Sequence, residues 1–191
     1  MPDDRRTVLA DTAIGVLAET GIRGLTHRAV DRAAGLAPGT TSAYYRTRRA
    51  LLTALVERLV ALDQAELQEI GDRTPVPRNA EELVAGIAAF VERRLTGEGR
   101  RRSLARYACA IESVHHPELR AILVPRENAG RQVVHDFLAA QGLSDAEART
   151  VTLLTCVDGL VFDRLVGGGS VSGQEIRRLV AAALQREPRG T

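Results

Sequence analysis

The sequence predicts an all-α protein made of an N-terminal helix-turn-helix domain and a larger helical domain. Apolar residues recur at helical spacing along most of the chain, and no segment shows the strict alternation of a half-buried strand. The 191 residues are 45% hydrophobic, which is enough to build one or two small cores. We place the domain boundary so that the two domains cover residues 1–50 and 51–191.

Residues 26–45 are expected to form two short helices joined by a tight turn, after a supporting helix over residues 5–20. Thr26 is a suitable N-cap, because its hydroxyl can accept a hydrogen bond from an unpaired amide of the first turn. Gly35 should end the first helix, since glycine enters the left-handed conformation at little cost. Pro38 suits the first position of the second helix, where its missing amide hydrogen costs nothing.

Six further helices are expected, over residues 48–70, 80–96, 103–115, 117–141, 145–166 and 173–185. The stretch 71–79 breaks the helical pattern with two prolines and a glycine, and GEGRRR (97–102) closes the helix before it. Ser144, followed three residues later by Glu147, predicts a capping box at the start of helix 145–166.

The helix over residues 145–166 is apolar nearly all round, and such a helix must be buried on every side. We expect one face to pack within its own domain and the opposite face to meet a second copy of the chain. Gly159 would let the two backbones approach closely. Helices 117–141 and 145–166 are thus expected to form the two-fold interface of a homodimer.

The segment from Pro38 to Tyr45 crowds small hydroxyls and two phenols into about two turns, and such groups suit base edges and phosphate oxygens. Arg46, Arg48 and Arg49 follow at once, and a guanidinium binds phosphate through a planar fork of donors. A chance cluster on a solvated helix end is the alternative. The helix-turn-helix pattern directly before the arginines favours nucleic acid, and residues 1–58 hold nine arginines against six acidic residues.

This stretch resembles the tetracycline-repressor-like (TetR-type) family of transcriptional regulators. Thr26–Leu51 aligns without a gap with the family pattern Thr-x-x-x-Ile-Ala-x-x-Ala-Gly-Val-Ser-x-Gly-Thr-Leu-Tyr-x-Tyr-Phe-x-x-Lys-x-x-Leu. Identical or conservative matches are Thr26, Val30, Ala34, Gly35, Leu36, Gly39, Thr40, Tyr44, Tyr45, Arg48 and Leu51. Among the departures, Asp31 replaces a small Ala between the two helices, Ala37 replaces a Ser cap, and Ser42 replaces a Tyr that touches a phosphate.

The resemblance implies a sequence-specific DNA-binding transcriptional regulator, a repressor that a small-molecule effector releases from a palindromic operator in double-stranded DNA. We expect Thr40, Thr41 and Tyr44 in the major groove and Arg28, Arg48 and Tyr45 on phosphates. The full set of predicted DNA-binding residues is Thr26, His27, Arg28, Pro38, Gly39, Thr40, Thr41, Ser42, Tyr44, Tyr45 and Arg48.

A ligand pocket is expected in the helical domain, because small-molecule sites are mostly apolar with a few placed polar groups. The predicted ligand-binding residues are Phe90, Arg106, Tyr107, Cys109, Glu112, His115, Asp158 and Phe162. The alternative for each polar member is that it faces water at a helix end. A buried Asp158 would need a partner, because an unpaired buried charge is very costly.

No catalytic set stands out, so we expect no enzyme, cofactor or metal site. Glu112 and His115 could share a helical face, but carboxylate-bridged metal sites in helical bundles need a second such pair and two further Glu residues. Cys109 and Cys156 lie in apolar helical patterns and are interpreted as buried, reduced residues. A small helical-bundle enzyme and a DNA-binding regulator controlled by a protein partner remain as alternatives.

No apolar run approaches the roughly 20 residues that a membrane-spanning helix needs. The N-terminus, MPDDRRTVLAD, has no uninterrupted apolar segment before its first charges, unlike a signal peptide. We therefore expect a cytoplasmic protein without membrane association.

Overall fold

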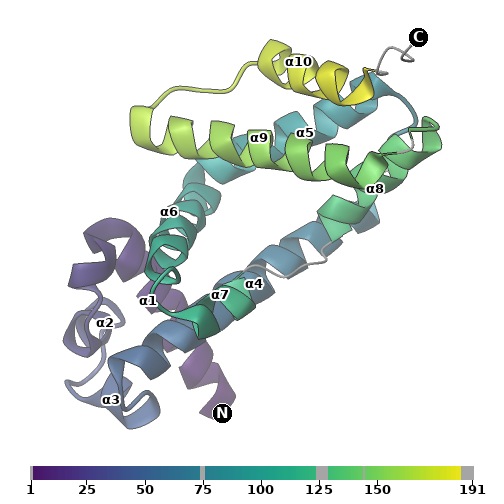
Figure 1. Ribbon diagram of the computed structural model, residues 1–191. Coiled ribbons are helices and arrows are strands. Elements are labelled where there is room, and N and C mark those ends of the chain that lie inside the picture. The colour runs from purple at the N-terminus through teal and green to yellow at the C-terminus, as the bar shows by residue number, and fades with distance from the viewer. Residues whose placement is uncertain (1, 74–75, 124–128, 144, 186–191) are drawn as a thin grey trace. The chain divides into compact units, whose positions relative to one another are not determined.

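The computed structural model describes residues 2–73, 76–123, 129–143 and 145–185, and every regular element in these ranges is a helix (Figure 1). The all-α prediction is confirmed. The chain forms two compact units: Met1–Ala65 with Gly97–Arg126, and Glu66–Thr96 with Glu127–Thr191. This division differs from the predicted boundary at residue 50, because a segment far along the chain packs with the N-terminal helices.

The first unit is built around helices α1 (Pro2–Gly24) and α6 (Gly97–Glu112), which lie side by side (Figure 1). It also contains α2 (His27–Ala33), α3 (Thr40–Tyr44), most of α4 (Arg48–Arg73) and α7 (Pro117–Leu123). Its core is a continuous cluster of buried side chains that includes Leu9, Leu17, Leu25, Val30, Leu51, Leu55, Leu59, Cys109, Leu119 and Leu123. At its edge, Arg58 of α4 donates two hydrogen bonds to the Asp11 carboxylate of α1, at 2.7 and 3.0 Å.

Helix α6 begins six residues earlier than the prediction of 103–115, so GEGRRR opens this helix and does not close the preceding helix, α5 (Ala80–Leu95). Glycines disfavour helix, but packing outweighs the propensity of a few residues. Gly99 is buried, and α6 packs closely on α1. The helix ends at Glu112, and His115 lies in the following turn, where its amide donates to the Glu112 carbonyl at 3.1 Å. The expectation that Glu112 and His115 share a helical face is therefore wrong.

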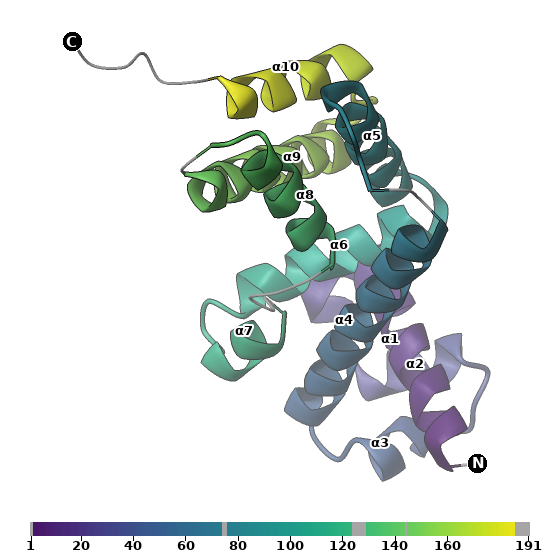
Figure 2. The ribbon, with the colours of Figure 1, turned by 90° about the vertical axis from the view of Figure 1, so that its right-hand side faces the viewer.

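The second unit packs α9 (Ala146–Gly167) against α5 (Ala80–Leu95), α8 (Ala129–Ala140) and α10 (Gly173–Leu184) (Figure 2). Buried Leu, Val, Ile and Phe side chains of all four helices form its core, among them Leu83, Ile87, Val91, Phe137, Leu138, Leu153, Val157, Val161, Ile176 and Val180. The single helix predicted over residues 117–141 is two helices, α7 and α8, one in each unit. Residues 124–128 between them lie outside the described residues.

Helix α9 is buried on one face only within this single chain. Val157 and Val161 are in the core, whereas Val151, Phe162 and Val166 are 44%, 45% and 73% exposed. The sequence predicts that this helix is buried on every side, and the single chain does not bury it in that way. The predicted cap, Ser144, lies outside the described residues.

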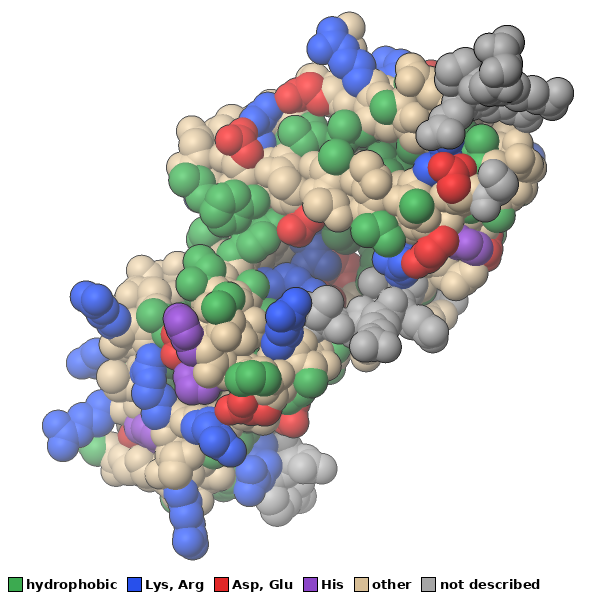
Figure 3. Space-filling view, in the orientation of Figure 1, with side chains coloured by type: hydrophobic (Ala, Val, Ile, Leu, Met, Phe, Trp, Pro, Cys, Tyr) green, Lys and Arg blue, Asp and Glu red, His purple; other side chains and the backbone are tan. Residues whose placement is uncertain are grey.

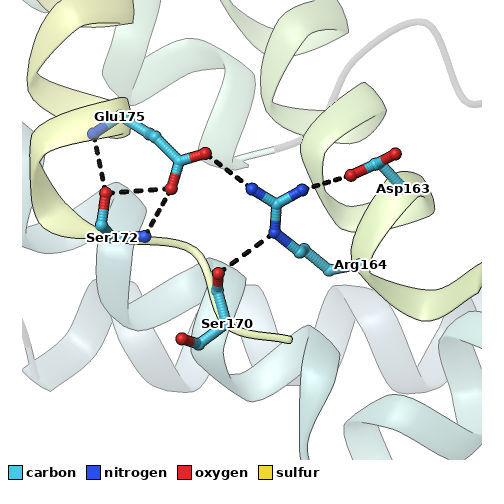
Figure 4. A network of polar contacts seen from close by, with 5 residues as sticks. All are labelled: Asp163, Arg164, Ser170, Ser172 and Glu175. Atoms are coloured by element: carbon cyan, nitrogen blue, oxygen red, sulfur yellow. Dashed lines mark hydrogen bonds and ion pairs between the residues drawn. The ribbon is translucent and has the colours of Figure 1, made fainter. Parts of the chain in front are cut away.

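The connection from α9 to α10 is held by a polar network centred on Arg164 (Figure 4). Its guanidinium donates to Glu175 at 2.7 Å and to the Ser170 carbonyl at 3.1 Å, and it also pairs with Asp163. Ser172 and Glu175 form a capping box at the start of α10. Cap and ion pair together fix where α10 begins.

Candidate nucleic-acid interface

Helices α2 and α3 form the helix-turn-helix that the sequence predicts. Thr26 caps α2, with its hydroxyl accepting from the Ala29 amide at 3.1 Å, and Gly35 leaves the helix with a φ of 66°. Both predictions are confirmed. Pro38, however, lies in the turn and not in the first position of α3, because the N-cap of α3 is Gly39, with a φ of 93°.

The side chain that caps α3 comes from α2. The Asp31 carboxylate accepts from the Gly39 amide at 2.8 Å, the Thr41 amide at 2.7 Å and the Thr41 hydroxyl at 2.5 Å. Asp31 is 2% exposed and Thr41 is fully buried. Burial raises the pKa of Asp31, but these hydrogen bonds lower it by more, so that the folded pKa lies below its ordinary value. The carboxylate stays charged, at the helix end that favours negative charge.

The other end of α3 is held by basic side chains from α1 and α2. Arg6 Nη1 donates to the Tyr44 carbonyl at 3.5 Å, and its guanidinium lies over the rings of Tyr44 and Tyr45, 5.7 and 5.6 Å from their centroids. His27 Nε2 lies 2.6 Å from the Tyr45 carbonyl, which makes it the donor. Helix α3 is therefore held at its N-terminus by the Asp31 carboxylate and at its C-terminus by the side chains of Arg6 and His27.

Two residues predicted to contact DNA are structural. Thr41 is fully buried, with its hydroxyl bonded to Asp31, so it cannot present that hydroxyl to a base in this conformation. Tyr45 is also buried, and its hydroxyl donates to the Arg6 carbonyl at 3.1 Å. Burial raises its pKa, although Arg6 opposes the shift. Both side chains therefore have partners within the unit, and their predicted contacts with DNA stay predictions.

Arg48 is also engaged within the protein. Its guanidinium donates to the Leu25 carbonyl at 2.7 Å and to the Ile22 carbonyl at 2.5 Å, which ties the start of α4 to the end of α1. Part of its donor fork is thus used in holding the fold. Its predicted phosphate contact stays a prediction.

The remaining predicted residues lie on the surface of the unit. Arg28, Pro38, Gly39 and Ser42 are exposed, and Thr40 and Tyr44 are half-buried. Ala43 of α3 and Thr47, which follows the helix, are exposed too and were not predicted, and Arg46 of the predicted arginine cluster is exposed between them. The space-filling view shows basic side chains projecting around the end of the unit that carries α2 and α3 (Figure 3).

Sequence reasoning missed the pairing of Asp31 with Thr41, although a signal for it was present. The family pattern has Ala and Leu at these two positions, and this chain has a polar residue at both. Two polar replacements on facing elements indicate a hydrogen-bonded pair, because a buried polar group needs a partner. Nothing comparable in the sequence points to the contacts of Arg6.

The predicted ligand-binding residues are divided between the two units. Cys109 lies in the core of the first unit, fully buried, and burial raises its pKa to about 12. Arg106 donates to Asp63 of α4 at 2.6 Å and to the Leu123 carbonyl of α7 at 3.0 Å, so it links three helices. The predicted ligand contact of Cys109 stays a prediction.

Tyr107 and Glu112 are half-buried on α6, and His115 is exposed in the turn after it. Glu112 has a neighbour in His116, whose Nε2 lies 3.6 Å from Glu112 Oε1. In the second unit, Phe90 stacks under the Arg94 guanidinium at 4.9 Å, and Asp158 and Phe162 are exposed on α9. Ligand contacts at these positions stay predictions.

A groove of about 230 Å³ runs between α9 and α10 in the second unit. Its lining includes Arg149, Thr152, Leu153, Cys156 and Leu179, and none of the predicted ligand-binding residues. Within the described ranges, no three His, Cys, Asp or Glu side chains gather in a way that could hold a metal ion. None of the helices described is long and apolar enough to cross a membrane.

Known proteins share this fold, and one family model matches the chain. The family model "Tetracyclin repressor-like, C-terminal domain" matches residues 78–186. The chain is 26% identical to the HTH-type transcriptional regulator BetI of Serratia proteamaculans over 194 residues, covering 97% of this chain and 93% of that protein. A transcriptional regulator from Rhodococcus sp. Rha1 has a TM-score of 0.73 at 24% identity, with 94% and 93% of the two chains covered. The multidrug binding protein EbrR, solved with imidazole, has a TM-score of 0.68 at 21% identity, with 97% of each chain covered. The chain belongs to the tetracycline-repressor-like (TetR-type) family of transcriptional regulators.

Proposed function

We propose that this regulator is a repressor that binds a palindromic operator as a homodimer and leaves it when a small molecule binds. The observation that carries the proposal is the exposed surface of α3, which is flanked by exposed arginines and held by a dedicated set of capping contacts. A helix held in this way by its own domain suits the reading of a DNA groove. Cytoplasmic location is part of the proposal, because the operator is reached there.

Thr40, Ser42 and Tyr44 are the proposed groove contacts, and Arg28 is the proposed phosphate contact. The exposure of Ser42 and Arg28 and the partial exposure of Thr40 and Tyr44 support these roles, as does the engagement of Thr41 and Tyr45 in contacts within the unit. Hydroxyls can donate to or accept from base edges, whereas a guanidinium on a phosphate positions the protein without reading sequence.

The proposed dimer uses the exposed face of α9. Val151 and Val166 are large apolar residues left in solvent on a helix whose other face is in the core. Gly159 lies between them, and a Cβ built there meets no atom within 4 Å, which leaves room for a second backbone. The two recognition helices of such a dimer would meet two half-sites related by two-fold symmetry.

The proposed effector is a small molecule bound in the helical domain, with Phe90 and Phe162, both in the second unit, as its first candidates for contact. EbrR has been solved with imidazole, ethidium and proflavin, which supports small-molecule binding in a relative of the same fold. Release requires that the effector bind the free regulator more tightly than the operator complex. The coupling is expected to be about 1 to 3 kcal/mol, or roughly 5- to 150-fold in affinity.

The test is selection of duplexes from a random pool by the purified full-length protein, followed by titration of the enriched duplex. We expect an enriched inverted repeat that binds two chains, and release when one of a panel of small molecules, starting with ethidium and proflavin, is added. Arg28→Ala should weaken all duplexes alike and lessen the salt dependence by about one contact. Failure to enrich any duplex would refute operator binding, and enrichment of a single unrepeated half-site would refute the dimeric mode.

A further inference from the structure

We propose that Asp31 and Arg6 are positioning residues that fix the orientation of α3 and thereby set how well the protein discriminates its operator from other DNA. The inference rests on the proposed operator binding through α3. Helix α3 is only five residues long. A helix of that length is not stable by itself, so its orientation must come from tertiary contacts.

At the N-terminus of α3, Gly39 provides no capping side chain, and Asp31 supplies the acceptor from α2. The carboxylate receives two backbone amides and the Thr41 hydroxyl, all within 2.8 Å. Bonds to a charged acceptor are roughly twice as strong as neutral ones. A rotation of α3 about its own axis would break at least one of them.

At the C-terminus of α3, Arg6 makes contacts from the first turns of α1. Its guanidinium donates to the last carbonyl of the helix and covers the rings of Tyr44 and Tyr45. The Tyr45 hydroxyl in turn donates to the Arg6 carbonyl. The acid lies at the end of α3 where the helix dipole is positive, and the base lies where it is negative, so both charges favour the same placement.

Orientation affects specific binding more than general binding. Hydrogen bonds to base edges need a donor–acceptor distance within a few tenths of an ångström, whereas attraction to phosphates is long-ranged and tolerant of small shifts. For Asp31, the two explanations predict opposite changes in affinity. Asp31 carries a negative charge close to the proposed DNA-binding surface, so simple electrostatics predicts that its removal strengthens binding to every duplex. A positioning role instead predicts weaker binding to the operator alone.

The experiment uses the full-length protein, the duplex that it enriches from a random pool, and a scrambled duplex of the same composition. Dissociation constants for both duplexes are measured for Asp31→Asn and Arg6→Gln, at several salt concentrations and below each variant's melting temperature. Asp4→Asn and Arg5→Gln are the matched controls, because both residues are exposed on α1 and carry the same charges.

We expect Asp31→Asn to lower the ratio of the two affinities about tenfold or more, equivalent to about 1.4 kcal/mol, with binding to the scrambled duplex unchanged or stronger. Arg6→Gln should lower the ratio without changing the salt slope. Each control should shift both affinities alike and leave the ratio unchanged.

An unchanged ratio in Asp31→Asn, or equal losses on both duplexes, would overturn the proposal. For Arg6→Gln, a salt slope reduced by about 0.9 with an unchanged ratio would make Arg6 a phosphate contact and not a positioning residue. If Asp31→Asn does not fold, Arg6→Gln decides, because Arg6 is exposed and outside the core. Failure of the unaltered protein to enrich a duplex would refute operator binding itself, before any variant is compared.

Discussion

At the scale of single residues, Asp31 and Thr41 form a buried polar pair at positions where the family pattern has Ala and Leu. Either single change, Asp31→Ala or Thr41→Leu, should lower the free energy of unfolding by about 2 to 4 kcal/mol, because the first removes the acceptor of two amides and a buried hydroxyl and the second sets a leucine against a buried carboxylate. The double variant should lose less than the sum of the two single losses, because its leucine no longer meets a carboxylate. Urea unfolding of the four proteins measures this, and additive losses in the double variant would contradict it.

The same carboxylate predicts how stability depends on pH. The folded pKa of Asp31 lies below its ordinary value of 3.8, because burial, which raises it, is outweighed by hydrogen bonds from Thr41 and Gly39. Its contribution is therefore complete above that ordinary value and is lost as the pH falls through the lowered folded value. Asp31→Asn should unfold with a weaker dependence on pH below about 4 than Asp4→Asn. If the free energy of unfolding fell equally with pH below about 4 in the two variants, this explanation would be contradicted.

The two cysteines should differ in reactivity. Cys109 is fully buried with a pKa raised to about 12, whereas Cys156 is exposed. Only a thiolate attacks a disulfide reagent. At pH 8 the folded protein should titrate one thiol, the Cys156→Ser variant none, and both proteins one more in denaturant. Fast reaction of Cys109 in folded Cys156→Ser would show that the core around it opens.

At the scale of elements, α6 is tied to α4 and α7 by Arg106, which donates to Asp63 and to the Leu123 carbonyl. Asp63 is itself buried. We expect Arg106→Met to lower the free energy of unfolding by about 1 to 3 kcal/mol, because a buried carboxylate loses its guanidinium. Arg101→Met, which removes a more exposed pairing with Glu19, is the control and should cost less than about 1 kcal/mol. Equal and small effects would indicate that Arg106 is free to serve a ligand.

The sequence predicts most elements but not how they are grouped. Local chemistry suffices for Thr26 and Gly35, because capping and left-handed turns depend on neighbouring residues only. It fails for the start of α6, where packing on α1 stabilises a glycine-rich segment that has low helix propensity. For Thr41 and Arg48 the residue types suit DNA, but tertiary partners use these groups inside the protein. Periodicity cannot reveal such partners, since they come from other helices.

At the scale of the whole molecule, assembly should depend on the exposed face of α9. Val166→Arg or Val151→Arg would place a charge in the proposed seam, where burying it unpaired is costly. In sedimentation equilibrium at micromolar concentration, the unaltered protein should be a dimer and these variants monomers that no longer bind the full operator. Val76→Arg, at a valine outside α9 whose exposure of 65% lies between those of Val151 and Val166, should stay dimeric. A dimeric Val166→Arg protein with full operator affinity would place the interface elsewhere.

The cap that Asp31 provides also has a consequence for engineering new specificities. An exchange of recognition helices between relatives would transfer residues 39–44 alone. The side chain that caps this helix, Asp31, lies eight residues before Gly39 in the sequence. A transplanted helix with Leu at position 41 would bring a methyl-rich surface against the Asp31 carboxylate. The segment to be exchanged is therefore discontinuous and consists of residue 31 together with residues 39–44. A chimaera that receives both should bind DNA, whereas a chimaera that receives only residues 39–44 should fold poorly.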